Sequence, residues 1–460
     1  MTDFPLFPPG FVFGAATASY QIEGAAYEDG RGPSIWDTYS HTPGLVTGGD
    51  TGDVACDHYH RYREDVALLR DLGVDSYRFS LAWPRIVPDG SGAVNPKGLD
   101  FYDRLVDELL AAGIEPAATL YHWDLPQALE DRGGWRTRET AEHFAAYTAV
   151  VAERLGNRVP RWITLNEPWC SAFLGYSVGR HAPGAREGRG ALAAAHHLLV
   201  GHGLAVQALR AAGVREAGIT LNLDRNLPAS PDSPADRAAV VRADTQHNLV
   251  WTEPLFAGRY PASEEETWGE LITGQDFRRP GDLELIGQPL DFLGINYYRP
   301  IVVADAPHRE TDPARRVATD NRYTEVRLDG VRHTAMDWPV APDTFTDLLV
   351  ALKERYGDAL PPVHITENGS AEHDEVSADG SVHDTDRVAY LRDHLRALRA
   401  ALDAGVDVRG YYVWSLLDNF EWAHGYGKRF GIVRVDYATQ RRTPKDSYRW
   451  YRDVIAAHRG

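Results

Sequence analysis

Short runs of β-branched and aromatic residues alternate along this chain with longer stretches in which apolar residues recur at helical spacing. This alternation is typical of parallel strands joined by crossover helices. The pattern predicts eight strands, at residues 11–16, 75–80, 115–121, 161–166, 218–223, 292–296, 363–366 and 410–415. It also predicts amphipathic helices between them, including 58–72, 98–112, 138–155, 192–211 and 385–404, several of which end in the glycine of a left-handed cap: Gly73, Gly113 and Gly405.

Eight strands with intervening helices predict an α/β fold of the (β/α)8, or TIM, barrel type. The sequence has no repeat of solenoid length and no low-complexity linker, so residues 1–460 are expected to form a single domain with extended loops at the C-terminal face of the barrel. In such barrels the catalytic residues lie at the carboxyl ends of the strands. Polar and aromatic residues gather at the predicted strand ends: Gln21, Arg78, His122, Trp123, Asn166, Glu167, Asn222, Asn296, Glu367 and Trp414.

Two long segments between predicted elements, 300–339 and 369–386, carry no regular pattern. Each follows a strand that ends in polar residues, and long loops in that position usually shape the rim of a pocket. The alternative is that they are surface insertions without a role. We expect them to form a rim.

Charge and cysteine content narrow the class of protein. The chain has 48 Lys and Arg against 66 Asp and Glu, a net charge of −18, which repels phosphate backbones and anionic lipids, so neither nucleic acid nor a membrane is expected as a partner. Cys56 and Cys170 cannot form a disulfide framework or a zinc site, which favours a reducing, cytoplasmic location. The uncharged stretch 4–22 is broken by prolines and polar residues, so we expect neither a signal peptide nor a membrane span there.

Two glutamates, Glu167 and Glu367, each end a predicted buried strand. On one barrel they could face each other across the mouth, and paired carboxyl groups are the equipment of glycoside hydrolysis, where one protonates the leaving oxygen and the other attacks or activates water. A lone glutamate at a strand end is more often solvated than catalytic, so context decides. The chain is rich in aromatic residues that suit the apolar face of a sugar: Trp123, Trp169, Tyr298, Trp414, Trp422 and Phe430.

Seven sequence blocks carry a resemblance to a known family. They are FGAATASYQIEG at 13–24, YRFSLAWPRI at 77–86, YHWDLPQ at 121–127, NEP at 166–168, NYY at 296–298, TENG at 366–369 and WSLLDNFEW at 414–422. With these blocks in order, the sequence resembles glycoside hydrolase family 1, the β-glucosidase family, from about Phe4 to Tyr451. A lone NEP would be weak evidence, but seven blocks in the family's order are strong.

The resemblance implies roles for individual residues. It makes Glu167 the acid/base and Glu367 the nucleophile, with Arg78 as the cation that supports the nucleophile by lowering its pKa. Residues that line the site of the cleaved sugar are then Gln21, His122, Trp123, Asn166, Asn296, Tyr298, Trp414, Glu421, Trp422 and Phe430. One departure is Phe13, where the family more often has Trp, and only local packing is in doubt there.

The remaining candidate residues have simpler interpretations. His196, His197 and His202 lie on a predicted helix without metal-binding spacing, and the segment 57–60 opens another helix, where capping is expected from Asp57. Lys428 and Arg429 lie in a predicted turn and are expected to be surface charges, one of which Glu421 could neutralise. No nucleotide-binding motif occurs, so the sequence implies no cofactor and no metal.

The leading hypothesis is a retaining β-glucosidase that removes terminal β-D-glucosyl residues from small β-glucosides or cello-oligosaccharides, as in cellulose degradation. A sugar-binding pseudoenzyme is disfavoured because both glutamates are present, whereas an enzyme that chiefly transglycosylates shares the same intermediate and stays open. The aglycone, the chain length and any homo-oligomer also stay open. Residues expected to border the aglycone are Trp169, Cys170, Leu174, His181 and Asn222.

Overall fold

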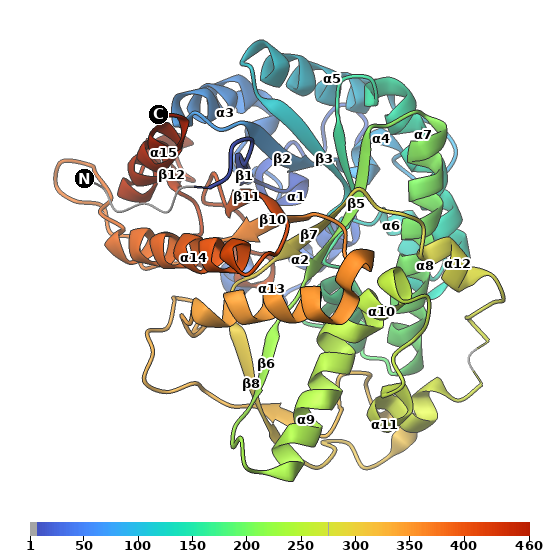
Figure 1. Cartoon of the computed structure of the whole chain (residues 1–460). Coiled ribbons are helices and arrows are strands. Elements are labelled where there is room, and N and C mark those ends of the chain that lie inside the picture. The colour runs from blue at the N-terminus through green and yellow to red at the C-terminus, as the bar shows by residue number, and fades with distance from the viewer. Residues whose placement is uncertain (1–6, 275) are drawn as a thin grey trace.

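The computed structural model describes residues 7–274 and 276–460, so Phe4 and Pro5 of the uncharged N-terminal stretch lie outside the described residues. Across these residues, eight parallel strands close into a barrel in the order β1-β11-β10-β7-β5-β4-β3-β2 (Figure 1). They are β1 (Val12–Ala16), β2 (Ser76–Ser80), β3 (Glu115–Tyr121), β4 (Arg161–Asn166), β5 (Glu216–Asn222), β7 (Phe292–Asn296), β10 (Val363–Asn368) and β11 (Val408–Trp414). The predicted (β/α)8 barrel is confirmed.

Long helices surround the barrel (Figure 1). They are α3 (His58–Leu72), α5 (Pro96–Ala111), α7 (Arg138–Leu155), α8 (Arg189–Ala211), α13 (Asp343–Tyr356), α14 (Thr385–Asp403) and α15 (Asp446–Arg459). The left-handed conformation predicted after three helices is present, with φ of 78° at Gly73, 75° at Gly113 and 84° at Gly405. Shorter helices complete the fold: α1 (Ser19–Ile22), α2 (Ile35–His41), α4 (Trp83–Ile86), α6 (Gln127–Glu130), α9 (Pro234–Asp244), α10 (Val250–Phe256), α11 (Glu264–Trp268) and α12 (Asp282–Ile286).

The barrel strands are buried on both faces, because side chains fill the barrel and the helices cover its outside. Phe13 of β1 is fully buried, and its ring packs edge-on against Phe11 at 5.1 Å and Tyr451 at 6.1 Å. The Phe at this position therefore has a complete aromatic environment. Helix α8 is long and apolar enough to cross a membrane by length and composition, but 83% of its most apolar window is buried inside the fold, as in the core helix of a folded domain.

The segment 300–339 is not irregular as expected. It contains β8 (Pro300–Asp305) and β9 (Tyr323–Glu325), which join β6 (Arg225–Pro228) in a separate three-stranded sheet. Figure 1 shows β6, β8 and α9 extending away from the barrel on one side. The segment does contribute to the pocket described below through Tyr323 and Trp338, so the expected rim is confirmed for this segment.

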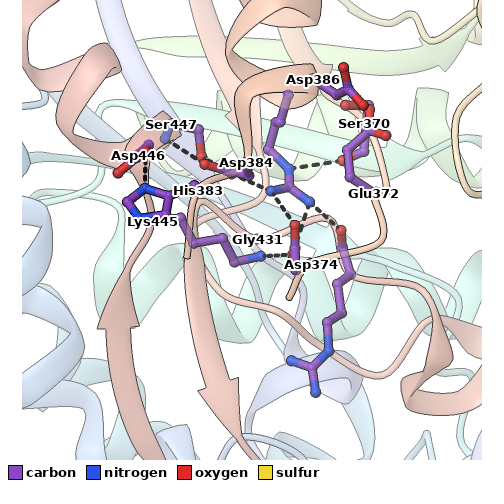
Figure 2. A network of polar contacts seen from close by, with 12 residues as sticks. Ser370, Glu372, Asp374, His383, Asp384, Asp386, Gly431, Lys445, Asp446 and Ser447 are labelled. Carbon is purple, nitrogen blue, oxygen red and sulfur yellow. Dashed lines mark hydrogen bonds and ion pairs between the residues drawn. The ribbon is translucent and has the colours of Figure 1, made fainter. Parts of the chain in front are cut away.

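The segment 369–386 was also expected to form a rim, and that expectation is wrong, because none of its described residues lines the pocket. It is held instead by a buried charge network. Asp374 accepts hydrogen bonds from Arg387 at 3.0 Å and from Lys445, and Ser447 donates a hydrogen bond to Asp384. Figure 2 shows Lys445 directed at Asp374 and Ser447 beside Asp384. The network ties the segment to the chain around β12 (Val433–Asp436) and β13 (Arg441–Pro444).

Two smaller expectations have different outcomes. Asp57 occupies the N-cap position of α3, but its side chain does not cap the helix; it binds His60 at 2.6 Å and Arg61 at 3.2 Å. The expected cap is therefore wrong, because the side chain finds charged partners in the first turn. Cys56 and Cys170 are both free and buried.

Candidate active site

A pocket of about 760 Å³ opens where the barrel strands end. Its walls include residues at the carboxyl ends of several strands, such as His122 after β3, Asn296 of β7 and Trp414 of β11. Most of the residues predicted to hold the sugar or react with it line this pocket: His122, Trp123, Glu167, Asn296, Tyr298, Glu367, Trp414, Glu421, Trp422 and Phe430. The residues expected on the aglycone side line it as well: Trp169, Cys170, Leu174, His181 and Asn222.

Glu367 is the second-to-last residue of β10 and is 3% exposed. Arg78 Nη1 donates a hydrogen bond to its Oε1 at 2.7 Å, and the Tyr298 hydroxyl donates to its Oε2 at 2.6 Å. Both carboxylate oxygens therefore accept a short hydrogen bond, and one of these comes from a permanent cation. This environment favours the ionised form against the cost of burial.

Glu167 directly follows β4 and is 6% exposed. Its Oε1 accepts a hydrogen bond from Asn296 Nδ2 at 2.7 Å, and its Oε2 accepts a weaker one from Cys170 Sγ at 3.2 Å. Neither donor carries a charge. The two glutamates thus have similar burial but different partners, because only Glu367 is paired with a cation.

The ends of β4 and β10 are irregular at the positions that present the glutamates. The register between β4 and β5 shifts between Ile163 and Asn166, and the register of β10 shifts after Ile365 against both of its neighbours. Shifts of this kind turn side chains away from the regular alternation of a strand. Glu167, Trp123 and Trp422 also have positive φ, at 44°, 77° and 50°, and backbone strain of this kind clusters at functional sites.

Asn166 and Asn296 connect the two glutamates through hydrogen bonds. Asn166 Oδ1 accepts hydrogen bonds from Arg78 Nη2 at 2.5 Å and from Asn296 Nδ2 at 3.0 Å. Asn166 Nδ2 lies 3.1 Å from His122 Nε2. Because Arg78 also binds Glu367 and Asn296 also binds Glu167, this chain of polar groups fixes the two carboxyl groups relative to each other.

Burial dominates the electrostatics of both glutamates. It raises the pKa of Glu167 to about 8, and the negative charge of Glu367 adds to that rise. The pKa of Glu367 is also raised by burial, although Arg78 and the Tyr298 hydrogen bond lower it. Arg78 therefore acts in the direction expected from the sequence, but the expectation of a net lowering is wrong, because burial outweighs the cation. The stronger stabilisation of the charged form at Glu367 still places the proton of the pair on Glu167.

Polar atoms in and directly behind the pocket wall lack partners in the described chain: His122 Nδ1 and Glu421 Oε2 of the lining, and Gln21 Oε1 behind it. Burial, together with the charges of Glu367 and Glu167, raises the pKa of Glu421 to about 8. Burial and Arg78 lower the pKa of His122, so its ring is neutral and can both donate and accept a hydrogen bond. Buried polar groups normally find partners, so these atoms indicate a polar ligand.

Aromatic rings form the walls of the pocket. Trp123 and Trp422 lie 4.5 Å apart between ring centroids, and the His122 ring is nearly parallel to Trp414 at 5.9 Å. Tyr298 and Phe430 lie 5.9 Å apart and pack in one cluster with Trp414. Flat apolar faces beside polar groups suit a sugar ring.

Three predicted residues do not line the pocket itself: Gln21, Arg78 and Asn166. Arg78 and Asn166 lie directly behind Glu367 and Asn296 through the hydrogen bonds described above. Gln21 donates hydrogen bonds to the Asn419 side chain at 3.1 Å and the Phe420 carbonyl at 2.9 Å, just before Glu421 in the chain. These residues therefore support the lining from behind.

Sequence reasoning missed other lining residues, among them Gln246, His247, Ile301, Met336 and Trp338. The Trp338 ring lies 5.3 Å from Tyr298 and 6.1 Å from Phe430. The only signal was its place in the long segment 300–339, since the residue belongs to no recognised block. His247 stacks on Trp169 at 4.8 Å and was not foreseen.

The other charged candidates take structural contacts. Lys428 donates to the Ala335 carbonyl, and Arg429 donates to Asp418 at 2.6 Å, so neither is a free surface charge and neither neutralises Glu421. The turn expected there is wrong, because Arg429 belongs to a bridge with Glu372. His196 binds Asp282 at 2.8 Å, and no grouping of three or more metal-ligating side chains occurs in the part of the chain that the structure describes.

Comparison with known proteins agrees with this geometry. The family model for glycosyl hydrolase family 1 matches residues 5–460. The chain is 53% identical to thermostable beta-glucosidase B of Thermobispora bispora over 98% of this chain and 90% of that protein. It is 48% identical to a bifunctional beta-D-glucosidase/beta-D-fucosidase of Bifidobacterium breve, over 98% of this chain and 99% of that protein. The structure of a family 1 β-glucosidase from Thermotoga maritima superposes with a TM-score of 0.93 at 46% identity, covering 99% of each chain.

Proposed function

This chain belongs to glycosyl hydrolase family 1 and is a glycoside hydrolase, and we propose that it is a retaining β-glucosidase. The observation that carries the proposal is the pair of buried glutamates in one pocket, of which only Glu367 is paired with a cation. Two carboxyl groups with opposite protonation states are what a double displacement requires. Relatives named as β-glucosidases, at 53% and 45% identity, support the choice of sugar.

In this proposal Glu367 is the nucleophile. Arg78 and Tyr298 hold its two oxygens, which keeps the carboxylate ionised and fixes its direction. One oxygen attacks the anomeric carbon, the bond from that carbon to the aglycone oxygen breaks, and a covalent glycosyl-enzyme ester forms with inverted configuration. The Arg78 hydrogen bond also steadies the carboxylate when it leaves in the second step.

Glu167 is the acid in the first step and the base in the second. With a pKa of about 8 it is protonated at neutral pH, so it donates its proton to the departing aglycone oxygen. It then accepts a proton from the water that attacks the anomeric carbon, and Glu367 leaves as a carboxylate. The second inversion restores the β configuration. A sugar hydroxyl in place of water would give transglycosylation by the same route.

The sugar is bound by the polar groups at the deep end of the pocket and by its aromatic walls. We assign hydrogen bonds from the sugar hydroxyls to His122, Asn296 and Glu421, which line the pocket, and to Gln21 and Asn166, which lie directly behind them. Gln21, His122 and Glu421 hold atoms without partners in the described chain. Apolar contacts are assigned to Trp123, Tyr298, Trp414, Trp422 and Phe430. Buried side chains line this part of the pocket, which supports binding of a terminal glucosyl residue.

We propose small β-glucosides and cello-oligosaccharides as substrates, acted on by one domain that spans the chain. The bifunctional relative in Bifidobacterium breve makes β-fucosides a second candidate class. A cytoplasmic location is proposed because Cys56 and Cys170 are free and buried. A sugar-binding protein without activity is the alternative, and it is disfavoured by the complete pair of carboxyl groups.

Hydrolysis of p-nitrophenyl β-D-glucoside, followed by NMR of the first sugar released, tests the proposal. We expect the β anomer to appear first and to mutarotate later. Release of the α anomer would refute retention, and the absence of any hydrolysis would refute the activity. Initial rates on matched glucosides, galactosides, fucosides and cello-oligosaccharides then rank the substrates.

A further inference from the structure

The outer part of the pocket carries three arginines that the activity does not explain. Arg180 and Arg186 lie between the π-helix η3 (Cys170–Ser177) and α8, and Arg309 follows β8. All three line the same pocket as Glu167 and Glu367 and are exposed. Two segments far apart in the sequence thus bring guanidinium groups to one opening. We call these three residues the arginine rim.

The guanidinium groups of the arginine rim make no ion pair or hydrogen bond within the described residues, although acidic residues are adjacent in the chain. Glu187 pairs with Arg136 at 3.7 Å, and Glu310 pairs with Arg315 at 3.5 Å. The nearby acidic residues are thus engaged elsewhere.

Two further charged residues near the arginine rim, Asp320 and Arg299, also have partners other than its guanidinium groups. Asp320 accepts hydrogen bonds from the backbone N–H groups of Arg309 and Glu310, both at 3.0 Å, and leaves the Arg309 guanidinium untouched. Arg299 also lines the pocket, but it is paired with Glu325 at 3.0 Å. The arginine rim therefore differs from the ordinary arginines of this surface, most of which have a carboxylate partner.

The charge balance of the outer pocket is opposite to that of the whole chain. The chain carries a net charge of −18, which repels anions at long range. Around the opening, the arginine rim and Arg299 face two carboxylates, Asp224 and Glu325, and Asp224 itself pairs with His247 at 3.3 Å. Clefts lined by one sign of charge focus their field on a ligand of the opposite sign.

The deep carboxyl groups do not cancel this field. Glu167 and Glu421, with pKa values of about 8, are mostly protonated at neutral pH, and Arg78 pairs with Glu367. His181 adds no charge, because burial and Arg180 lower its pKa to about 3. Burial lowers the pKa of His424, and the charges of Lys428 and Arg180 lower it further.

The arginine rim lies on the side from which the leaving group departs. Glu167 protonates that group in the proposed reaction, and η3 begins at Cys170, whose thiol contacts Glu167 at 3.2 Å. The same stretch of chain continues through Leu174 and His181 of the pocket wall and carries Arg180 and Arg186. An aglycone that leaves past Glu167 therefore moves toward the guanidinium groups.

We propose that the arginine rim is a leaving-group subsite that selects β-glucosides whose aglycone carries a carboxylate. The inference rests on the proposed function and adds the substrate class. Guanidinium groups without partners can each form two parallel hydrogen bonds with a carboxylate, and their exposure leaves room for aglycones of different length. A neutral aglycone gains nothing from these groups.

The test compares two aryl glucosides that differ in one charge: 4-carboxyphenyl β-D-glucoside and its methyl ester. The variant R180Q/R186Q/R309Q is expected to lower kcat/KM for the carboxylate about three- to thirtyfold and for the ester less than twofold, given the usual strength of exposed charge pairs. The ratio between variant and original protein removes the difference in leaving-group reactivity. Raising the ionic strength to about 0.5 M should weaken the effect of the charge.

The control variant R70Q/R104Q/R441Q makes the same change in net charge at exposed arginines outside the pocket. It should move both substrates by less than twofold. Equal losses on both substrates in the rim variant, or an equal effect in the control variant, would overturn the subsite. Failure of the unmodified protein to hydrolyse the ester would instead refute the proposed β-glucosidase activity, so the two failures are distinguishable.

Discussion

Arg78 Nη1 donates a hydrogen bond to Oε1 of Glu367 at 2.7 Å, and the two side chains are 1% and 4% exposed. A pair this deeply buried is costly to form, because both ions lose their water. The net pKa of Glu367 is raised in spite of the cation. In the proposed mechanism, Arg78 therefore favours the ionised form of the buried carboxylate that acts as nucleophile.

The variant R78K tests this relationship through the pH profile. Lysine keeps the charge but cannot bind Glu367 and Asn166 together with one planar fork, so the pKa of Glu367 should rise further. Because activity needs this carboxylate ionised, the acidic limb of kcat/KM should move to higher pH. The maximum should fall about 10- to 100-fold, the value of one or two charge-assisted hydrogen bonds.

The matched control for R78K is R85K. Arg85 is equally buried and pairs with Glu23 at 3.0 Å, but neither residue lines the pocket. R85K should lower stability without moving the acidic limb. An unchanged limb in R78K, or the same displacement in R85K, would show that Arg78 does not control the ionisation of Glu367.

The basic limb should report Glu167. Its pKa is raised to about 8, so the acid is protonated below that pH and activity falls as the pH rises through it. The Cys170 thiol donates to the carboxylate and lowers this pKa, so C170A should move the basic limb to higher pH. C56A removes a buried thiol that donates to the Asp418 carbonyl instead, and its profile should match the original. A basic limb that moves down in C170A would contradict the assignment.

The roles of the two glutamates can be separated with azide. E367G should abolish turnover, and azide should then occupy the space of the missing carboxylate and give an α-glucosyl azide from an activated donor. E167G should retain the first step on glucosides with good leaving groups, and azide should give the β product. NMR of the products decides, and the same anomer from both variants would show that the assignment is wrong.

The barrel could be predicted from the sequence because each of its strands is a short apolar run closed by a turn or a polar residue. Glu167 and Glu367 could be placed because strand ends converge on one face of a barrel. The three-stranded sheet of β6, β8 and β9 could not, since its strands pair with each other across long segments of weak pattern. Trp338, which follows β9 in the chain, lines the pocket but lies in no recognised sequence block.

The net pKa shifts of the site residues could not be predicted from the sequence either. A cation beside Glu367 is expected to lower the pKa of that carboxyl group. The net pKa also depends on how deeply the group is buried, which only the packed structure shows. In the same way, Asp374 and Lys445 lie 71 positions apart and meet only because the segment 369–386 folds back on the chain near β13. The segment 369–386 was expected to form the pocket rim, but its contacts with Lys445 and Arg387 hold it away from the pocket lining.

Glu421 is expected to make the enzyme prefer an unphosphorylated sugar. Its Oε2 is buried without a partner in the described chain. Lys428 and Arg429 bind Ala335 and Asp418, so neither of these two cations is free for a phosphate beside Glu421. E421S should lower kcat/KM on the neutral glucoside about 10- to 100-fold, since a hydroxyl cannot replace the carboxyl hydrogen bonds. Matched p-nitrophenyl β-glucoside and its 6-phosphate provide the measurement. A higher kcat/KM for the 6-phosphate than for the neutral glucoside in the original protein would refute the expected preference for an unphosphorylated sugar.

The buried network around Lys445 should contribute to stability. The ammonium is fully buried between Asp374 and Asp418, and burial lowers its pKa. K445M would leave Asp374 with Arg387, and Asp418 with Arg429 and the Gly431 N–H. Removing one member of a buried pair typically costs about 3–5 kcal/mol. The urea midpoint, followed by tryptophan fluorescence and by loss of activity, should therefore fall clearly.

The position of the network makes the activity readout informative. Arg387 donates to the Arg429 carbonyl at 2.7 Å, next to Phe430 of the pocket wall, so the pocket should loosen with the network. The control R452M breaks an exposed pair, in which Arg452 lies 3.4 Å from Asp71, and such pairs contribute at most about 1 kcal/mol. Equal urea midpoints for K445M and R452M would mean that the network does not stabilise the fold. A fall confined to K445M, with activity lost at the same urea concentration as the fluorescence signal, would show that the pocket and the network unfold together.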